Sequence, residues 1–407
     1  MAGNEGARVL IDGTMARAGG GFTYLVNVVP MLARLAPDDR FLVLVRSDAI
    51  CSALASAPNL TIELLPVVGA AGRLWFASSE GARIARRWKA DLYFSAGEIT
   101  PAHPPCPRIA SFRNPSVFQQ LDPAAPRSER LRLLTLRALA RMSARGCERI
   151  VFVSEDSARW IGDAIELPQE RRAVIHHGID PRPWRAARLR GRTQARRYIL
   201  SVSSVYRYKN FVRLIEAYRL LAARREAGTP DLVLIGDEQD VDYGRKMREA
   251  RAAAGRLAEQ IRILGEVPYA DVHGWYGGAE LFVFPSTLET FGHPLLEAMA
   301  AEVPVVAADL PVFREIAADA VRYVDPFDVE ALATAMAADL EPSPAREQRV
   351  RRAAERVRRF GWDRSATRLL ALFASVLAER SGARLRWQPP DPALEAPGPG
   401  PPGASQL

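Results

Sequence analysis

The chain has 407 residues, 48% hydrophobic and 25% charged, which is the composition of a globular protein long enough for two domains. It contains neither an apolar run of about 18 residues nor a basic leader followed by an apolar core, so it predicts neither a membrane-spanning helix nor a signal peptide. The three cysteines, Cys51, Cys106 and Cys147, are widely spaced and odd in number, which excludes a cysteine metal pair and indicates free thiols in a reducing cytoplasm.

The net charge of +8 is confined to the first half of the chain. Residues 1–190 carry 26 basic and 18 acidic side chains, whereas the remaining residues carry 29 of each. A basic half could bind nucleic acid, anionic lipid headgroups or a phosphorylated acceptor. An arginine-rich composition on a solvated surface is the alternative. Only Lys89, Lys209 and Lys246 are lysines, so each lysine position is a candidate for a specific role.

Short apolar, β-branched runs alternate with helical patterns along the chain. Strands are predicted in the first half at 8–12, 41–46, 60–65, 91–95, 108–112 and 149–154, and helices at 22–35 and 127–145. In the second half, strands are predicted at 198–203, 232–236, 262–264, 280–285 and 304–308, and helices at 214–225, 244–259 and 294–301. This alternation predicts an α/β protein with parallel sheets covered on both faces, and two such domains imply a ligand cleft at the carboxyl ends of their strands. A Pro- and Arg-rich seam at 181–197 separates the halves, and the Pro/Gly-rich residues from 388 onward predict a disordered tail.

Residues 284–299 carry the most chemical information. A predicted strand ends at Pro285, a glycine-containing loop follows, and Pro294 occupies a first-turn position of the next helix. The main-chain N–H groups of Phe291, Gly292 and His293 would point outward at the positive end of this helix, an arrangement suited to a pyrophosphate.

Two carboxylates, Glu289 and Glu297, flank this predicted anion site. A carboxylate beside a phosphate is repelled, so we expect both to accept hydrogen bonds from the neutral hydroxyls of a ribose or a hexose. A solvent-exposed loop acid and an acid near a helix start are the alternative.

This segment resembles the signature of the family 4 retaining glycosyltransferases, which have the GT-B fold of two Rossmann-like domains facing across a cleft. The similarity continues through 304–308, 312–316 and 324–326. In that family the glutamate matching Glu289 contacts the donor sugar and the one matching Glu297 binds the nucleotide ribose. The family usually has glycine where this chain has Thr290 and Glu302.

A basic loop follows the strand predicted at 198–203. A cation at the carboxyl end of a strand can neutralise a leaving diphosphate, and Lys209 matches the family's phosphate-binding lysine in its Lys-Asn or Lys-Gly pair. A surface lysine that starts a helix is the alternative. Where the family often has an arginine this chain has Ser204, and Arg207 could supply the second phosphate cation.

Three further segments resemble family motifs. Residues 19–24 resemble the glycine loop that closes over the donor phosphate, here through Gly20 and Gly21, and residues 265–268 resemble the loop that holds the nucleobase, here through Val267. Where many members have His-Asp this chain has Arg113 and Asn114, and Asn114 could bind a sugar hydroxyl. Residues 175–180 resemble a hinge segment, for which a structural role is expected.

Two further segments resemble functional motifs but have a simpler structural interpretation. Asp240 and Asp242 imitate the metal-binding Asp-x-Asp of the GT-A fold, but we expect a solvated polar turn there. The helix predicted at 127–145 mixes Leu131, Leu134, Leu139 and Met142 with many arginines, so it could lie on a membrane surface or bury its leucines in its own domain.

The resemblance implies a retaining hexosyltransferase that moves a sugar from a nucleotide-sugar donor to a glycan or lipid-linked acceptor in cell-surface polysaccharide or glycolipid biosynthesis, with no metal and no cofactor. The expected domains are 1–185 for the acceptor, 186–345 for the donor, 346–387 as helices that cross back to the first domain, and 388–407 as the tail. The expected location is the cytoplasm, with peripheral contact between the basic first half and the anionic inner membrane face, and with no nucleic acid partner. A nucleotide-sugar epimerase or hydrolase on the same fold, and a non-catalytic sugar-nucleotide-binding partner, are the alternatives.

Overall fold

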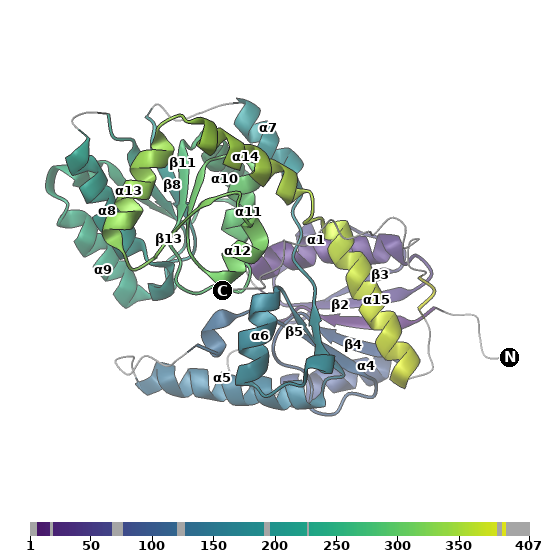
Figure 1. Ribbon diagram of the computed structural model, residues 1–407. Coiled ribbons are helices and arrows are strands. Elements are labelled where there is room, and N and C mark those ends of the chain that lie inside the picture. Colours follow the sequence, from purple (N-terminus) through teal and green to yellow (C-terminus); the bar gives the residue numbers. More distant parts are fainter. Residues whose placement is uncertain are drawn as a thin grey trace, which may run out of the picture. The chain divides into compact units, whose positions relative to one another are not determined.

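A computed structural model of the protein describes residues 6–16, 19–66, 76–119, 127–190, 196–225, 228–380 and 385–387. The predicted tail at 388–407, and residues 191–195 of the predicted seam, lie outside the described residues. The chain packs into two compact units, one formed by Met1–Ile109, Gly146–Glu148 and Ala366–Leu407 and the other by Ala110–Arg145 and Arg149–Ser365. Over the described parts, helices follow strands in alternation from one end to the other, as predicted (Figure 1).

The first sheet has seven strands in the order β3-β2-β1-β4-β5-β6-β7. They are β1 (Arg8–Asp12), β2 (Arg40–Val45), β3 (Leu60–Leu64), β4 (Leu92–Ser95), β5 (Arg108–Phe112), β6 (Arg149–Phe152) and β7 (Arg172–Val174). The helices along this part of the chain are α1 (Gly19–Leu35), α2 (Asp48–Ala53), η1 (Phe76–Glu80), α4 (Gly81–Trp88), η2 (Pro115–Val117), α5 (Arg127–Gly146), α6 (Glu155–Ala164), η3 (Gln169–Arg171) and α7 (Pro181–Arg190). In the parallel register Leu10 of β1 lies between Leu42 and Tyr93, and these apolar side chains are part of the core.

The second sheet has six strands in the order β10-β9-β8-β11-β12-β13. They are β8 (Tyr198–Val202), β9 (Asp231–Ile235), β10 (Ile261–Gly265), β11 (Leu281–Phe284), β12 (Val305–Ala308) and β13 (Arg322–Val324). The helices along this part of the chain are η4 (Arg207–Lys209), α8 (Phe211–Arg224), α9 (Val241–Ala252), η5 (Gly255–Glu259), α10 (Tyr269–Gly278), α11 (His293–Ala300), α12 (Pro311–Ala317), α13 (Val329–Leu340), α14 (Pro344–Val357) and α15 (Trp362–Arg380), and the residues of α15 from Ala366 onward belong to the other unit. Every strand pair with a defined register in this sheet is parallel, so the loops after β8 and β11 leave the same edge.

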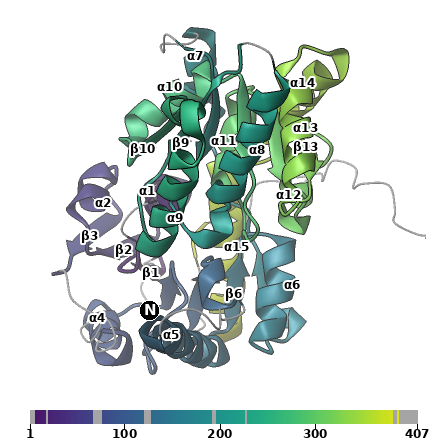
Figure 2. The same cartoon turned by 90° about the vertical axis from the view of Figure 1, so that its left-hand side faces the viewer.

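Two apolar clusters cover the two faces of the second sheet. One contains buried side chains of α7, α10, α11, α12 and α14, and the other contains those of α8, α9 and α13. Figures 1 and 2 show where these helices lie along the sheet. The sheet is therefore buried on both faces, which explains why its strands read as continuous apolar runs rather than as alternating patterns.

Every strand predicted from the sequence is present, with its ends shifted by at most two residues. The short strands β7 and β13 were not predicted. The single helix predicted at 244–259 is wrong, because α9 ends at Ala252 and Gly255 takes a left-handed conformation with φ of +60° before η5. A left-handed residue cannot continue an α-helix.

Helix α5 leaves part of its apolar surface in water. Leu133 and Ala140 are buried, whereas Leu131 is 67% exposed, Met142 is 62% exposed and Leu134 is also exposed. The expectation that the helix buries its leucines in its own domain is therefore wrong for Leu131 and Leu134. Within the part of the chain that the structure describes, no helix combines the length and the apolar content needed to cross a bilayer.

Candidate functional site

The loop after β11, residues 286–292, leads into the N-terminus of α11 and is called the donor loop below. Gly292 precedes the helix with φ of +89°, and a Cβ there would lie 2.7 Å from the ring of Phe313, so only glycine fits. Helix α11 begins at His293, with Pro294 in its first turn, and no side chain caps it. Among the described residues no acceptor pairs with the main-chain N–H groups of Phe291, Gly292 and His293, so these groups are open to a ligand, and their role at an anion site stays a prediction.

Lys209 and Glu289, predicted on separate loops, form a buried ion pair. The Lys209 Nζ lies 2.5 Å from the Glu289 Oε1, and the two side chains are 12% and 9% exposed. The ammonium also lies 5.1 Å from the centre of the Tyr208 ring. The predicted phosphate cation and the predicted sugar ligand therefore share one small volume, in which hydroxyls and phosphate oxygens could replace the ion pair.

Asn210 fixes the loop that carries Lys209. Its φ of +64° is left-handed, which asparagine tolerates better than most residues and which accounts for the Lys-Asn or Lys-Gly pattern. The buried Asn210 Nδ2 donates to the carbonyl oxygens of Pro285 at 3.1 Å and Pro326 at 2.6 Å. The side chain thus ties the loop after β8 to the start of the donor loop.

Glu297 is a buried side chain of α11, 8% exposed. Burial raises the pKa of its carboxyl to about 7, although the hydroxyl of Tyr276 donates a 2.9 Å hydrogen bond that lowers it. Near neutral pH this group therefore exchanges between an acid and a carboxylate, unlike a solvent-exposed glutamate. The contact of Glu297 with Tyr276 was not predicted, because the glycine-rich helix α10 that carries Tyr276 was not predicted.

Two histidines pack against each other at the donor loop, His177 buried and His293 half-buried. The His177 Nδ1 is 2.5 Å from the His293 Nε2, so one ring donates a proton and the other accepts it. Burial, followed by the positive charge of Arg113, lowers the pKa of His293 to about 4, and burial holds the pKa of His177 well below its usual range. Both rings are neutral at pH 7, and the predicted structural role of the hinge segment agrees with this packing.

The Arg113–Asn114 segment lies against the donor loop. The Thr290 hydroxyl donates to the carbonyl oxygen of Arg113 at 2.7 Å, and the Ser154 hydroxyl donates to the carbonyl oxygen of Thr290 at 2.7 Å. The exposed side chain of Asn114 accepts from the N–H of Ser116 and caps η2. The hydrogen bonds that Thr290 makes with Arg113 and with Ser154 were not predicted, because they join segments that are distant in the sequence.

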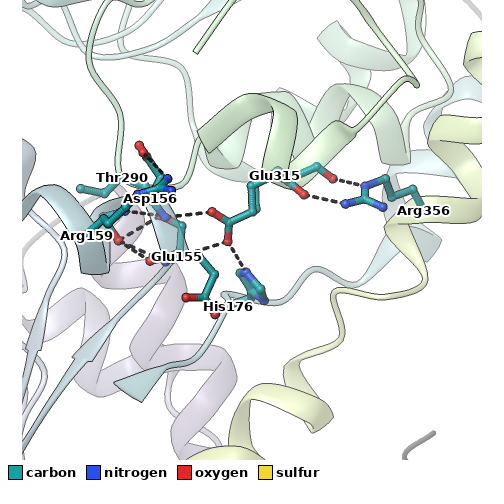
Figure 3. A network of polar contacts seen from close by, with 10 residues as sticks. Glu155, Asp156, Arg159, His176, Thr290, Glu315 and Arg356 are labelled. Atoms are coloured by element: carbon teal, nitrogen blue, oxygen red, sulfur yellow. Dashed lines mark hydrogen bonds and ion pairs between the residues drawn. The ribbon is translucent and has the colours of Figure 1, made fainter. Parts of the chain in front are cut away.

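Figure 3 shows a polar network around Glu315 of α12. Its carboxylate accepts hydrogen bonds from the N–H groups of Glu155 at 2.8 Å and Asp156 at 3.0 Å, and the His176 Nε2 lies 2.7 Å away. Burial alone would raise the pKa of Glu315, but the hydrogen bond from His176 and those from the two N–H groups lower it below its ordinary value. Glu315 thus caps the N-terminus of α6 from a position about 160 residues further along the chain.

The other predicted donor contacts are more open. Arg207 is exposed, whereas Ser204 and Val267 are half-buried. In the other unit, Gly20 is exposed and Gly21 half-buried in the first turn of α1, where a Cβ on Gly21 would lie 3.1 Å from the side chain of Ala16.

The Asp240–Asp242 pair lies at the start of α9 rather than in a loop. Asp240 caps the helix by accepting from the N–H of Tyr243 at 2.9 Å, and Asp242 is in its first turn. Both carboxylates therefore stabilise a helix N-terminus. No cluster of three or more metal-ligating side chains occurs among the residues that the structure describes.

Two protein-family models match the chain in succession. Residues 18–182 match the model described as Glycosyltransferase Family 4, and residues 188–356 match the model described as Glycosyl transferases group 1.

Curated relatives include an O-antigen chain mannosyltransferase B of Escherichia coli, 33% identical over 42% of this chain and 44% of the relative. A phosphatidyl-myo-inositol mannosyltransferase of Mycolicibacterium smegmatis is 33% identical over 58% of this chain and 59% of the relative. The chain thus matches about half the length of these relatives.

Solved structures agree on the fold. The Anabaena protein Alr3699/HepE, crystallised with UDP-glucose, superposes with a TM-score of 0.70 at 18% identity over 90% of this chain and 99% of that one. A glycosyltransferase of Rickettsia africae superposes with a TM-score of 0.69 at 16% identity over 92% of this chain and 99% of that one. The two family matches and the two parallel sheets together show that this chain belongs to the family 4 glycosyltransferases with the GT-B fold.

Proposed function

We propose that the protein transfers a hexose-type sugar from a nucleotide diphosphate donor to a glycan or lipid-linked acceptor, with retention of anomeric configuration and without a metal ion. The observation that carries this proposal is the buried Lys209–Glu289 pair together with the unpaired N–H groups at the start of α11. Lys209 and the N–H groups are suited to bind the negative charge of a diphosphate, and the Glu289 carboxylate is suited to accept a hydrogen bond from a sugar hydroxyl. The names of the relatives support a glycan or lipid-linked acceptor, and the UDP-glucose complex of the Anabaena protein supports a nucleotide sugar.

The chemistry follows from where charge develops. As the bond between the anomeric carbon and the diphosphate oxygen breaks, the carbon becomes oxocarbenium-like and negative charge accumulates on the diphosphate. Lys209 and the N–H groups of the donor loop stabilise that charge, while Glu289 and Glu297 hold the sugar and the ribose by accepting hydrogen bonds. The acceptor oxygen then bonds to the anomeric carbon on the face that the diphosphate leaves, and the proton of the acceptor hydroxyl passes to the departing diphosphate oxygen on the same face.

A panel of nucleotide sugars, each incubated with and without glycan and polyprenyl-linked acceptors, tests this proposal. We expect release of nucleoside diphosphate that depends on the acceptor, with NMR of the product giving the anomeric configuration. Release without an acceptor would indicate a hydrolase, a changed sugar without release an epimerase, and binding without turnover a non-catalytic partner. Inversion at the anomeric carbon would contradict retention alone.

We further propose that the basic first half brings the protein to an anionic membrane surface, where a lipid-linked acceptor would be found. The support is the outer face of α5, on which the exposed Leu131, Leu134 and Met142 are accompanied by exposed Arg130 and Arg141. Apolar side chains flanked by arginines suit the interface of an anionic bilayer.

Vesicle flotation tests this contact. The protein should float with vesicles that contain phosphatidylglycerol, less so at high salt, and not with phosphatidylcholine alone. The Leu131→Ser/Met142→Ser variant should lose flotation, whereas Val241→Ser, an equally exposed apolar position next to Asp240 and Asp242 on α9, should retain it. Unchanged flotation of the double variant would contradict a role for α5 and leave the proposed transfer reaction untouched.

A further inference from the structure

Thr290 occupies a buried position in the donor loop between the sugar-facing Glu289 and the first unpaired N–H group. It is held on two sides, since its hydroxyl donates to the carbonyl oxygen of Arg113 and its own carbonyl oxygen accepts from the hydroxyl of Ser154. Figure 3 shows Thr290 beside the start of α6, where Glu155 and Asp156 are held by Glu315.

The Ser154 hydroxyl has one proton and two acceptors within reach, the carbonyl oxygen of Thr290 at 2.7 Å and the hydroxyl oxygen of Ser157 at 2.9 Å, and the shorter contact is the one to Thr290. The Ser157 hydroxyl donates to the carbonyl oxygen of Ser154 at 2.9 Å, and the Ser154 hydroxyl accepts from the N–H of Ser157 at 3.0 Å. The bond from Ser154 to Thr290 uses the Ser154 proton, and the bond from Thr290 to Arg113 uses the Thr290 proton. The two bonds therefore operate together rather than as alternatives.

Both bonds act on main-chain groups that the donor site uses. The carbonyl of Thr290 and the N–H of Phe291 belong to one planar trans peptide and point in opposite directions. A hydrogen bond from Ser154 to that carbonyl therefore fixes the direction of the first N–H group proposed for the diphosphate. In the same way, the bond from Thr290 to the carbonyl of Arg113 fixes the peptide that leads into Asn114.

Two departures from the family pattern meet at the bond between Thr290 and Arg113. Thr290 stands where the resembled family usually has glycine, and Arg113–Asn114 stands where many members have His-Asp. These positions are 177 residues apart in the chain, yet the atoms lie at 2.7 Å. A glycine has no side chain that could make this bond.

We propose that Thr290 is a positioning residue for sugar transfer, whose hydroxyl fastens the donor loop to the Arg113–Asn114 segment and so holds in place the loop whose N–H groups receive the diphosphate. The proposal rests on the proposed function. It assigns to Thr290 no contact with the substrate, and it predicts an effect on turnover rather than on binding, because the N–H groups matter most when charge develops on the diphosphate.

The test compares three substitutions at one position. Thr290→Val keeps the shape and removes the hydroxyl, and we expect kcat to fall about tenfold with the donor KM within about twofold, the size expected for one lost hydrogen bond. Thr290→Ser keeps the hydroxyl and should stay within about threefold of the parent. Thr290→Gly restores the usual family residue but loses the bond, so it should lose activity as Thr290→Val does.

Thr287 provides a matched control in the same loop. Its hydroxyl donates to the carbonyl oxygen of Tyr208 at 3.2 Å, but that oxygen also accepts from the N–H of Thr287 at 2.7 Å, so Thr287→Val should change kcat less than twofold. Thermal unfolding of all variants monitors folding, and Thr290→Ser reports on the hydroxyl even if Thr290→Val is unstable.

Three outcomes would overturn the proposal while the parent protein still transfers sugar. These are an unchanged kcat in Thr290→Val, a Thr290→Ser variant as slow as Thr290→Val, and parent-like activity in Thr290→Gly. Absence of transfer by the parent protein would instead contradict the proposed function.

Discussion

The predicted site residues of the two halves of the chain differ in how firmly they are held. In the second half, Lys209 and Glu289 are paired with side chains only 12% and 9% exposed, and Glu297 is buried against the Tyr276 hydroxyl. The other predicted donor residues of that half are more open, with Ser204 and Val267 half-buried and Arg207 exposed. In the first half, Gly20 and Asn114 are exposed and Gly21 is half-buried.

This difference fits the ligands proposed for each half. A diphosphate and a ribose present the same charges and hydroxyls in every donor of one class, so rigid, desolvated groups can be arranged for them in advance. Residues exposed to water make few contacts before a ligand arrives. Substitutions among the buried residues should therefore have large and distinct effects, and four predictions test this, from the largest effect to the smallest.

The largest effect is expected from Lys209→Ala. Charge grows on the leaving diphosphate in the transition state, and loss of one such contact in a closed site costs about 2.7–4 kcal/mol, so kcat should fall by about 10² to 10³. The exposed Lys246 on α9 gives the matched control, and Lys246→Ala should keep the parent kcat.

Removal of Lys209 also leaves the buried Glu289 without its partner, which destabilises a protein by itself. The Lys209→Ala/Glu289→Gln variant tests the stability effect, because it should recover stability to heat; its turnover is compared with that of Glu289→Gln alone, and the further loss measures the contribution of Lys209. An increase in donor KM at unchanged kcat would show that Lys209 only binds the ground state.

The second prediction separates the two glutamates. Glu297→Gln should weaken binding of the nucleoside diphosphate product by about tenfold or more, because it removes a charged acceptor for the ribose hydroxyls. Glu289→Gln should leave product affinity nearly intact and chiefly reduce transfer, since the product has no sugar. Calorimetric titration of both variants with the nucleoside diphosphate measures these affinities. Equal losses of product affinity in the two variants would contradict the division of roles.

The third prediction uses the pKa of Glu297, which burial raises to about 7. A ribose diol binds the carboxylate better than the acid, so product affinity should decline as pH falls through about 7. The affinity of the Glu297→Gln variant for the same product, measured over the same pH range, should not show this decline. A decline of equal size in both proteins would come from protonation of the diphosphate rather than of Glu297.

The raised pKa of Glu297 also predicts how the free energy of unfolding depends on pH. A raised pKa in the folded state means that the contribution of Glu297 to the free energy of unfolding is present below its ordinary value of 4.5 and is lost as pH rises through about 7. Between pH 5 and 8 the ligand-free parent should therefore lose more stability than Glu297→Gln does. Denaturant titrations at a series of pH values measure the difference.

The smallest effect is expected from removing divalent metal. The positive groups proposed for the diphosphate are Lys209 and the main-chain N–H groups, so transfer in excess chelator should proceed at the parent rate. Loss of activity that Mg²⁺ or Mn²⁺ restores would contradict this and would point to carboxylates such as Asp240 and Asp242.

Local sequence patterns were sufficient to predict all strands of the two sheets except β7 and β13, together with the loop after β11, whereas Lys209, Glu289 and Glu297 were singled out by the family resemblance and their roles stay predictions. Apolar runs report burial, and successive parallel strands end at one edge of a sheet, so residues after β8 and β11 could be expected near each other. The strands β7 and β13 were missed because runs of three residues carry too little pattern.

The tertiary structure alone decided which of these side chains contact each other and in what charge state. The Lys209–Glu289 pair, the neutralising burial of Glu297 against Tyr276, the His177–His293 contact and the bond from Thr290 to Arg113 each join elements that are distant in sequence. Their distances depend on how helices pack on strands, and the pKa of a carboxyl depends on the water removed around it. Neither quantity is a property of a residue and its neighbours in the chain, so both had to be read from the folded protein.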